Sequence, residues 1–464
     1  MTVQSSRTPV RPIDHDYPTG EVARRIYSEQ LLQRAVEAYR FFYPTVSMEA
    51  VMEGQRAIGI EDNVGILLVA AGPRHVILTS NSDTPYAAAV LDLAAGGPFV
   101  IDMPAGPYIG LLDDHDFRWI VDVGLPGPDG GRGGRYVVLP PGFTGNITGG
   151  VHIVRAATNK ILVALRAIPD RDGIAGAIEA LRRVKVFPLN KPDAVLGFVD
   201  STQRTLDSTP LRWEDNLEQW RRLHAVLQSE PAREEFRPMY GELASLGIVK
   251  GYPFPTDRAL HALLEGAAHK ALDQMRIAAF ASGRPDRIVW PDRKWEWVGL
   301  VADANFETSH FLDLEARDRW FFQAIGASPA MFRKQPGAGS IYFLAARDAT
   351  GAYLDGSKSY ELTVPMPVPA NLFWSVTVYD AHTRAQIQAP QDKAVIGSLQ
   401  TTFPPGNTAK LFFGPSAPKD HAEHWIQTKP GQGFFLYFRI YGPEAACFDG
   451  KWRPGDPTIV STAS

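Results

Sequence analysis

The hydrophobic period of the chain changes twice along its length, and this constrains the fold more than any other feature of the sequence. Before about residue 168 and after about residue 339, apolar residues come in short runs rich in β-branched and aromatic side chains, which is typical of strands. Between these parts the spacing becomes helical, and the clearest apolar stripe runs from Leu260 to Met275. The sequence therefore predicts a mainly β protein with a helical middle, α+β overall.

At 464 residues the chain is too long for one compact core. We expect an N-terminal helix and lead-in at 1–44, an N-terminal β module at 45–168, a helical connecting segment at 169–338 and a C-terminal β-sandwich module at 339–464. Glycine (41) and proline (37) are frequent, and many short strands between turns favour β-sandwich or jelly-roll-like modules.

The expected elements follow from the same spacing. A helix is predicted over Glu21–Phe42, ended by Pro44. Strands are predicted in the N-terminal module at Val64–Ala70, His75–Ser80, Phe99–Met103, Tyr108–Leu112, Phe117–Val123, Tyr136–Leu139 and Val151–Arg155. Strands are predicted in the C-terminal module at Ser340–Ala345, Tyr360–Pro365, Asn371–Asp380, Ala409–Gly414 and Phe434–Tyr441.

The net charge and the cysteine content limit which binding partners and which cellular compartment are expected. Lys and Arg total 47 and Asp and Glu total 51, so the formal net charge is −4 and no basic excess favours nucleic acid. Cys447 is the only cysteine, which excludes an intrachain disulfide and fits a reducing compartment. Met1–Tyr17 has no apolar signal core, and no window reaches ~18 uncharged apolar residues. We expect a cytoplasmic protein without membrane or nucleic-acid partners.

Several strings resemble a known pair of domains. They are Asn81-Ser82-Asp83-Thr84-Pro85-Tyr86, Asp355–Tyr360, Phe373–Asp380, Arg439–Pro443 and Asp449–Trp452. Together they are similar to the paired bacterial domains of unknown function twelve-fifty-four (N-terminal) and twelve-fourteen (C-terminal), over roughly Glu37–Arg166 and Gly339–Pro454. The resemblance implies two β-sandwich-like modules with a helical connection, and it implies no chemistry because fold does not give function.

The Asn81–Tyr86 string has two interpretations. It gathers an amide, a carboxylate, a hydroxyl and a phenol, so a pocket there could use Asp83 as a general base with Asn81 and Tyr86 as hydrogen-bond donors. Alternatively, Asn81 or Asp83 forms an Asx-type turn that binds backbone amides. Both interpretations stay open at this point.

Asp113-Asp114-His115-Asp116 is the densest group of ligand-type side chains. Carboxylates with an imidazole suit iron, zinc or manganese, but neighbours on a strand point to opposite faces. A tight hairpin turn between Tyr108–Leu112 and Phe117–Val123 explains the string without metal. We therefore expect no metal site and no cofactor.

Alternation in two C-terminal strands separates an apolar face from an aromatic, polar face. Phe434, Leu436, Phe438 and Ile440 oppose Phe435, Tyr437, Arg439 and Tyr441, and Phe373, Ser375, Thr377 and Tyr379 oppose Trp374, Val376, Val378 and Asp380. The aromatic face indicates either a small-molecule pocket or a domain interface, and an aromatic-rich exposed face is a third alternative. Arg439 is expected to point away from the core, toward the other module or a cleft.

The leading functional hypothesis is a small-molecule enzyme with acid–base hydrolytic or lyase chemistry on a partly apolar organic substrate. Asp83, Tyr86, Tyr379, Asp380 and Arg439 are the predicted catalytic residues, with Asp83 as base and Arg439 holding an anionic or carbonyl oxygen. The predicted substrate-binding residues are Asn81, Thr84, Trp374, Ser375, Thr377, Tyr437 and Tyr441. A non-catalytic ligand-binding or assembly protein is the alternative, and a metalloenzyme using Asp113–Asp116 is a further one. A small-molecule partner is expected, and homo-oligomer formation is left open.

Overall fold

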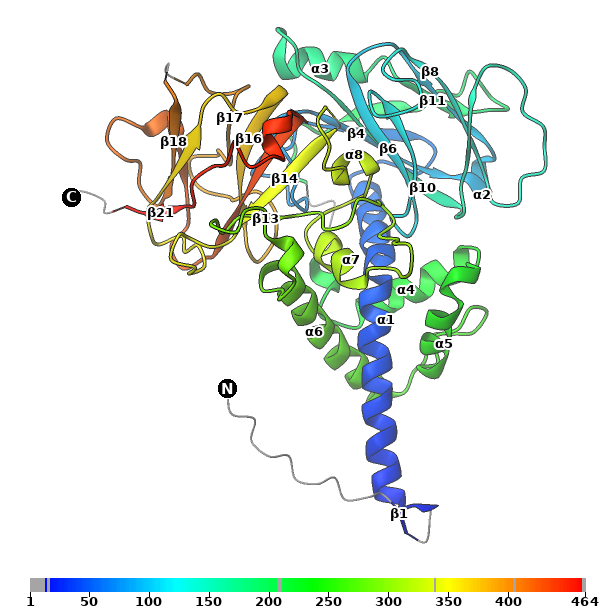
Figure 1. The fold of residues 1–464 in the computed structure, drawn as a ribbon. Helices are drawn as coiled ribbons and strands as arrows, with labels where there is room; N and C mark the ends of the chain where they lie inside the picture. The colour runs from blue at the N-terminus through cyan, green and yellow to red at the C-terminus, as the bar shows by residue number, and fades with distance from the viewer. Residues whose placement is uncertain (1–12, 15–16, 207–210, 338, 404–405, 461–464) are drawn as a thin grey trace. The chain divides into compact units, whose positions relative to one another are not determined.

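A computed structural model of the chain describes residues 13–14, 17–206, 211–337, 339–403 and 406–460 (Figure 1). The N-terminal stretch used for the signal prediction lies outside these residues, except for Ile13–Asp14 and Tyr17. In the described residues, no helix combines the length and apolar content that a membrane crossing requires. The chain divides into two compact units, one drawn from Met1–Phe42, Arg212–Gln228 and Ala232–Gln274, and the other from Tyr43–Leu211, Ser229–Pro231 and Met275–Ser464.

The first unit is helical. It is built from the first part of α1 (Gly20–Ala57), most of α4 (Glu218–Ser229), α5 (Arg237–Ser245) and most of α6 (Arg258–Phe280), and it includes the short strands β1 (Ile13–Asp14) and β2 (Tyr17–Pro18). Its core contains Trp220, which packs edge-on against Tyr39 at a centroid distance of 6.1 Å and donates from Nε1 to the Leu264 carbonyl at 2.9 Å. The predicted helical middle is confirmed.

The predicted stop at Pro44 is wrong, because α1 continues through it to Ala57. Proline inside a helix removes a backbone hydrogen bond at a cost of about 3 kcal/mol. The helix after it carries Val46, Met48 and Met52, none of which is accessible to solvent. Burial of these side chains, on more than one side of the helix, offsets the cost, at roughly 1.5–3 kcal/mol for each large side chain.

The second unit holds both β modules. The N-terminal module is a sandwich of a six-stranded sheet, ordered β12-β3-β4-β10-β6-β7, and a four-stranded sheet, ordered β11-β5-β8-β9. Its strands are β3 (Gly65–Val69), β4 (Tyr86–Asp92), β5 (Phe99–Met103), β6 (Tyr108–Asp114), β7 (Trp119–Gly124), β8 (Gly134–Leu139), β9 (His152–Arg155), β10 (Lys160–Ala167), β11 (Lys185–Pro188) and β12 (Gly197–Asp200). Helices α2 (Leu93–Gly96) and α3 (Gly173–Leu181) complete it, and side chains of both sheets, such as Leu68 and Ile101, share one core.

The C-terminal module is a second sandwich. A five-stranded sheet, ordered β13-β14-β20-β16-β17, packs on a four-stranded sheet, ordered β19-β18-β15-β21, and residues of both sheets form one core. Its strands are β13 (Glu296–Trp297), β14 (Ser340–Ala345), β15 (Tyr360–Pro365), β16 (Ala370–Asp380), β17 (Val395–Gly397), β18 (Thr408–Gly414), β19 (Trp425–Gln427), β20 (Phe434–Pro443) and β21 (Thr458–Ile459). Helices α7 (Leu314–Phe321) and α8 (Pro329–Phe332) precede β14.

The sheets of both β modules include strands from the segment that was predicted to be a helical connection. Strands β11 and β12, which follow residue 168, complete the N-terminal sheets, and β13, which precedes residue 339, pairs with β14. Strands β4 and β10 were not predicted, although they pair with each other and β10 also pairs with β6. Their alanine, leucine, lysine and arginine residues favour helix locally, and pairing within the sheet overrides that preference.

The predicted strand His75–Ser80 is wrong. His75 forms only an isolated bridge with Leu206, and Thr79 has a φ of 37°, which a β-branched residue rarely adopts. The end of this stretch binds the C-terminal module through its backbone: the Thr79 amide donates to the Arg384 carbonyl at 2.8 Å, and the Ser80 carbonyl accepts from Tyr379 at 2.6 Å. The stretch is a strap between the modules, and it forms part of the candidate site.

Candidate functional site

A cavity of about 180 Å³ lies between the two β modules, wholly within the second unit. Its walls come from strands β3, β4, β6 and β10 of the N-terminal sandwich and from β14 and β20 of the C-terminal one. The end of α1, residues 77–80 of the strap with the adjacent Asn81, and the segment between Trp320 and Met331 close the remaining sides.

One wall is the outer face of the six-stranded sheet. Two rows of residues cross its strands: Val69, Tyr86, Arg166 and Ile109 form the first, and Leu67, Ala88, Ala164 and Leu111 form the second. The rows are two residues apart along each strand, which corresponds to about 7 Å. The intervening residues, such as Ala87 and Leu165, point into the sandwich core. The first row therefore places a charged and a phenolic group beside an aliphatic second row.

The small side chains of the second row explain why a cavity exists between the sheet and the C-terminal module. Ala88 and Ala164 lie opposite each other on paired strands, and both are only half-buried although they line an interior wall. Larger side chains at these positions would fill the space between the sheet and the C-terminal module. The cavity is thus a consequence of two small residues at one register position.

The opposite wall confirms the alternation expected for the C-terminal strands. Phe434, Leu436, Phe438 and Ile440 lie in the core of the C-terminal sandwich, whereas Tyr437 and Arg439 line the cavity. Ser340 and Tyr342 of the neighbouring β14 line it as well. The aromatic face therefore lines a cavity and also contacts the N-terminal module, as the hydrogen bond from Arg439 to the Thr79 carbonyl shows.

Arg439 is held by the protein on three sides. Its Nη1 donates to Tyr379 Oη (2.6 Å) and Thr377 Oγ1 (3.1 Å), and its Nη2 donates to the Thr79 carbonyl (2.6 Å). The Tyr342, Tyr379 and Tyr437 ring centroids lie 5.6, 5.4 and 5.1 Å from its Cζ, within cation–π range. Its role is to join the strap to the C-terminal sheet, and its charge remains beside the cavity.

Arg166 is less completely bound. Its Nη1 donates to Tyr441 Oη at 3.2 Å, and its Cζ lies 5.6 Å from the Tyr86 ring centroid. Within the described residues, its Nε and Nη2 have no hydrogen-bond partner and no carboxylate pairs with it, yet the side chain is only 9% exposed. It therefore presents free donors and an unpaired positive charge to the cavity.

The charge around the cavity is unbalanced. Among the described residues that line it, there is no Asp, Glu, His or Lys. Asp83, buried behind the strap, accepts hydrogen bonds from Ser375 Oγ (2.6 Å) and Gln400 Nε2 (3.0 Å). Burial raises the pKa of Asp83, although the Ser375 hydrogen bond and the charge of Arg439 oppose this. Two more buried carboxylates lie behind another part of the wall, where Asp122 accepts from Ser328 Oγ (2.6 Å) and Asp113 accepts from the Ala327 amide (2.8 Å).

The Asn81–Tyr86 string forms a turn and also contributes to the cavity. Asn81 Oδ1 accepts from the backbone amides of Asp83 (3.2 Å) and Thr84 (3.3 Å), as in an Asx-type turn, and Asn81 Nδ2 donates to Tyr441 Oη. Asn81 and Tyr86 both line the cavity. The turn positions the amide and the phenol at the wall.

The predicted catalytic residues fall into three places. Tyr86 and Arg439 line the cavity, and Tyr379 and Asp83 lie behind its wall as hydrogen-bonded supports. Asp380 lies apart from them and accepts from the backbone amides of His382 (2.9 Å) and Thr383 (2.8 Å) in a turn after β16.

The predicted substrate-binding residues are similarly divided. Asn81 and Tyr437 line the cavity, whereas Thr84, Thr377 and Tyr441 bind residues that line it, and Ser375 binds Asp83 behind the wall. Trp374 lies in the core of the C-terminal sandwich, stacked on Phe438 at 5.4 Å. Sequence reasoning missed Arg166 and Tyr342. Alternation would have found Arg166, because Leu162, Ala164 and Arg166 share one face of β10 and Ile161, Val163 and Leu165 share the other.

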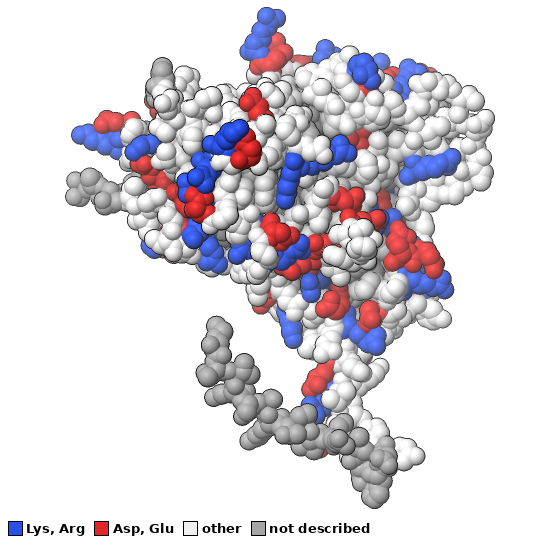
Figure 2. Space-filling model, in the orientation of Figure 1, with Lys and Arg blue, Asp and Glu red and all other residues white. Residues whose placement is uncertain are grey.

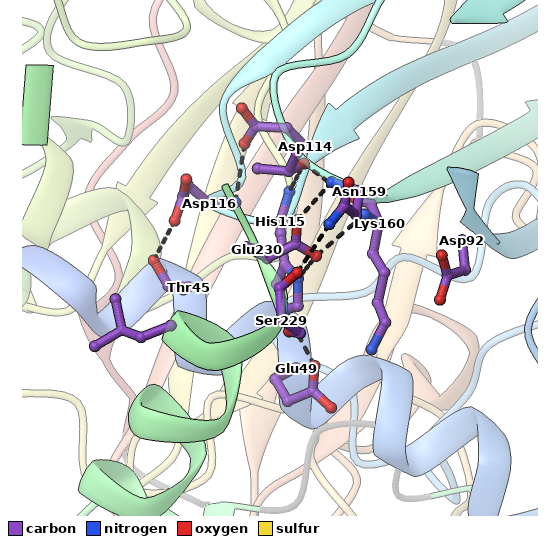
Figure 3. Close-up of polar contacts among 12 residues, drawn as sticks. Thr45, Glu49, Asp92, Asp114, His115, Asp116, Asn159, Lys160, Ser229 and Glu230 are labelled. Carbon is purple, nitrogen blue, oxygen red and sulfur yellow. Dashed lines mark hydrogen bonds and ion pairs between the residues drawn. The ribbon is translucent and has the colours of Figure 1, made fainter. Parts of the chain in front are cut away.

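The turn predicted for the Asp113–Asp116 string lies further along the chain: Asp113 and Asp114 end β6, and His115 and Asp116 begin the turn to β7 (Figure 3 labels Asp114, His115 and Asp116). The three aspartates have different partners: Asp113 Oδ2 accepts from the Ala327 amide (2.8 Å), Asp114 Oδ1 from the Asp116 amide (2.9 Å), and Asp116 Oδ1 from Thr45 Oγ1 (2.6 Å). In the described part of the chain, no three His, Cys, Asp or Glu side chains are grouped so as to hold a metal ion.

His115 of the same turn lies between two carboxylates (Figure 3). Its Nδ1 is 3.0 Å from Glu230 Oε1 and its Nε2 is 3.1 Å from Glu49 Oε2. Burial disfavours the imidazolium, but Glu230 and Glu49 outweigh burial and raise the pKa of His115 to about 9. Burial likewise opposes ionisation of Glu49, yet His115, with Lys160 and Arg56, lowers the pKa of Glu49 to about 2. These three residues, the His115 cluster, form a buried charged contact away from the cavity lining.

The comparisons with known families agree with the resemblance seen in the sequence. Residues 66–188 match "Protein of unknown function (DUF1254)", and residues 339–445 match "Protein of unknown function (DUF1214)". The chain carries both domains. Arg166 lies in the DUF1254 domain and Arg439 in the DUF1214 domain, so the cavity is built jointly by the two.

The fold is shared with a solved structure. The VPA0106 protein from Vibrio parahaemolyticus is 16% identical, with a TM-score of 0.58, over 93% of this chain and 100% of that one. An uncharacterized protein from Burkholderia cenocepacia is 12% identical, with a TM-score of 0.43, over 95% of this chain and 94% of that one. No curated protein matches the chain.

Proposed function

We propose that this protein binds a small organic anion in the cavity between its DUF1254 and DUF1214 domains. The observation that carries the proposal is Arg166, a buried guanidinium with free donors and no carboxylate partner in the described residues. Removing an ion from water costs several kcal/mol even after the protein relaxes around it. A bound anion would offset this cost and satisfy the free donors with charge-assisted hydrogen bonds.

The rest of the wall favours a ligand with an apolar body. Most of the lining is aliphatic or aromatic, as Leu67, Val69, Leu111 and Leu162 illustrate. Small-molecule sites commonly combine such walls with a few oriented polar groups. On the face drawn in Figure 2, basic and acidic side chains are interspersed and form no continuous basic patch. The positive charge that matters for this proposal is therefore inside the molecule.

Acid–base catalysis is the second candidate. It is supported by Tyr86, whose phenol lies in the same row as Arg166 and could donate a proton to an oxygen that Arg166 holds. The carboxylate predicted as base, Asp83, is engaged behind the wall. Hydrolytic or lyase turnover that disappears in Tyr86→Phe, while carboxylate binding persists, would favour the enzyme over the binding protein.

Arg166→Met tests the binding proposal. Removing a charge-assisted contact to a buried anion costs 2 kcal/mol or more, so we expect affinity for carboxylates to fall at least about thirtyfold. The melting temperature without ligand should stay at or above that of the wild type, because methionine removes a buried unpaired ion. Calorimetric titration with acetate, hexanoate and benzoate, together with melting curves, measures both effects.

The matched control is Arg155→Met. Arg155 lies on β9 of the same domain, exposed to solvent and outside the cavity lining. The Arg155→Met variant should bind the same carboxylates with the same affinity as the wild type. If the Arg166→Met variant binds carboxylates with unchanged affinity, Arg166 is not part of a binding site and the proposal is wrong.

A further inference from the structure

The cavity limits the size of the ligand. Its volume is about 180 Å³. An apolar cavity of about 150 Å³ engineered into another protein holds one benzene molecule. A single six-membered ring therefore fits here with room for about one carboxylate group.

The spacing of the wall places the two parts of such a ligand. The Arg166 row and the row of Ala88 and Ala164 are two residues apart, or about 7 Å along the strands. A carboxylate bound at Arg166 would direct a ring attached to it over the two alanines. Both alanines are half-buried, and the surface that they expose lines the cavity.

The charge of the site limits the charge of the ligand. Both Nη atoms of Arg439 bind the protein, whereas Arg166 retains free donors. Among the described residues of the lining, Arg166 is thus the one guanidinium that offers free donors to a ligand, and a single such group suits a monoanion better than a dianion. The planar fork of a guanidinium matches the two oxygens of a carboxylate.

We infer that the ligand is a monocarboxylate whose body is a single six-membered ring or an aliphatic group of similar size. This inference rests on the anion-binding function proposed above. Arg166 binds the carboxylate, and Ala88 and Ala164 set the size of the body that is accepted.

The test is a titration of the full chain with benzoate, acetate, benzamide and inorganic phosphate. Benzoate should bind at least about a hundredfold more tightly than acetate, because the ring buries five more carbons than the methyl group does. Benzamide, the neutral isostere, should bind at least about tenfold more weakly than benzoate because it lacks the charge. Phosphate should bind more weakly than benzoate.

Ala164→Leu tests the size limit. The leucine would occupy the space over the second row, so benzoate affinity should fall at least about thirtyfold while acetate affinity stays within about threefold. The matched control is Ala194→Leu, at an exposed position shortly after the residues that match DUF1254. This control should bind benzoate and acetate as tightly as the wild type does. A melting curve establishes that the variant is folded, and Ala88→Val replaces it if it is not.

The outcomes separate the two proposals. Acetate or phosphate binding as tightly as benzoate, or unchanged benzoate binding in a folded Ala164→Leu or Ala88→Val variant, would overturn the ligand class and leave anion binding intact. Benzamide binding as tightly as benzoate would overturn the role of charge. If none of the anions binds, the proposed function itself fails.

Discussion

Asp83→Ala is expected to lower the free energy of unfolding by about 3 kcal/mol, because it removes a buried carboxyl group that accepts two hydrogen bonds. Asp83 is inaccessible to solvent, and its loss would leave Ser375 and Gln400 without their acceptor. Chemical denaturation of the wild type and the Asp83→Ala variant at neutral pH measures the difference in the free energy of unfolding.

Two controls separate charge from geometry. Asp83→Asn keeps the shape and one acceptor, so it should lose about half as much stability as Asp83→Ala. Asp380→Ala removes a carboxylate that binds two backbone amides in a half-buried turn, at a cost of about 1 kcal/mol. Equal losses in Asp83→Ala and Asp380→Ala would mean that Asp83 is only another turn residue.

The second large effect concerns pH. The pKa of His115 is raised from its ordinary 6.5 to about 9, so its stabilisation is fully present below pH 6.5 and is lost as the pH rises through 9. The pKa of Glu49 is lowered from 4.5 to about 2, so its share is present above pH 4.5 and is lost as the pH falls through 2. The His115 cluster should therefore stabilise the fold most between pH 4.5 and 6.5, with His115 contributing about 3 kcal/mol.

His115→Leu should abolish the alkaline decline and lower stability at pH 6 by about 3 kcal/mol, because it leaves Glu49 and Glu230 without the cation between them. Denaturation midpoints at intervals from pH 5 to 9.5 would show this. His310→Leu, at an exposed histidine, should follow the wild-type profile. A decline between pH 6.5 and 9 that is equally steep in wild type and His115→Leu would exclude the cluster as its cause.

Local periodicity accounts for the parts of the site that were predicted. Period-two alternation in β16 and β20 separates core from cavity because every second side chain faces the same way, and it placed Tyr437 and Arg439 correctly toward the other module. The same rule applied to β10 would have found Arg166. The strand is hard to recognise locally because Lys160–Ala167 is rich in residues that also favour helix.

Other features depend on partners far along the chain. Glu230 lies 115 residues from His115, and Thr79 lies 360 residues from Arg439. No window of sequence contains both members of such a pair, so the polar string at Asp113–Asp116 could be predicted to lie at a turn but not to be part of a buried charged cluster. The strap at His75–Ser80 was predicted as a strand for a similar reason, because Thr79 and Ser80 bind backbone and side-chain groups of the C-terminal module that lie about 300 residues further along the chain.

The shared walls of the cavity have one more consequence. Arg166 and Tyr86 come from the DUF1254 domain, and Arg439 and Tyr342 come from the DUF1214 domain. Any molecule that fills the space contacts both domains, and a molecule that binds only the assembled form stabilises the assembly by mass action. Such a ligand would stabilise the association of two domains that are covalently connected through a long intervening segment. Its occupancy could then be followed as resistance of the domain pair to separation, before any chemistry of the ligand is known.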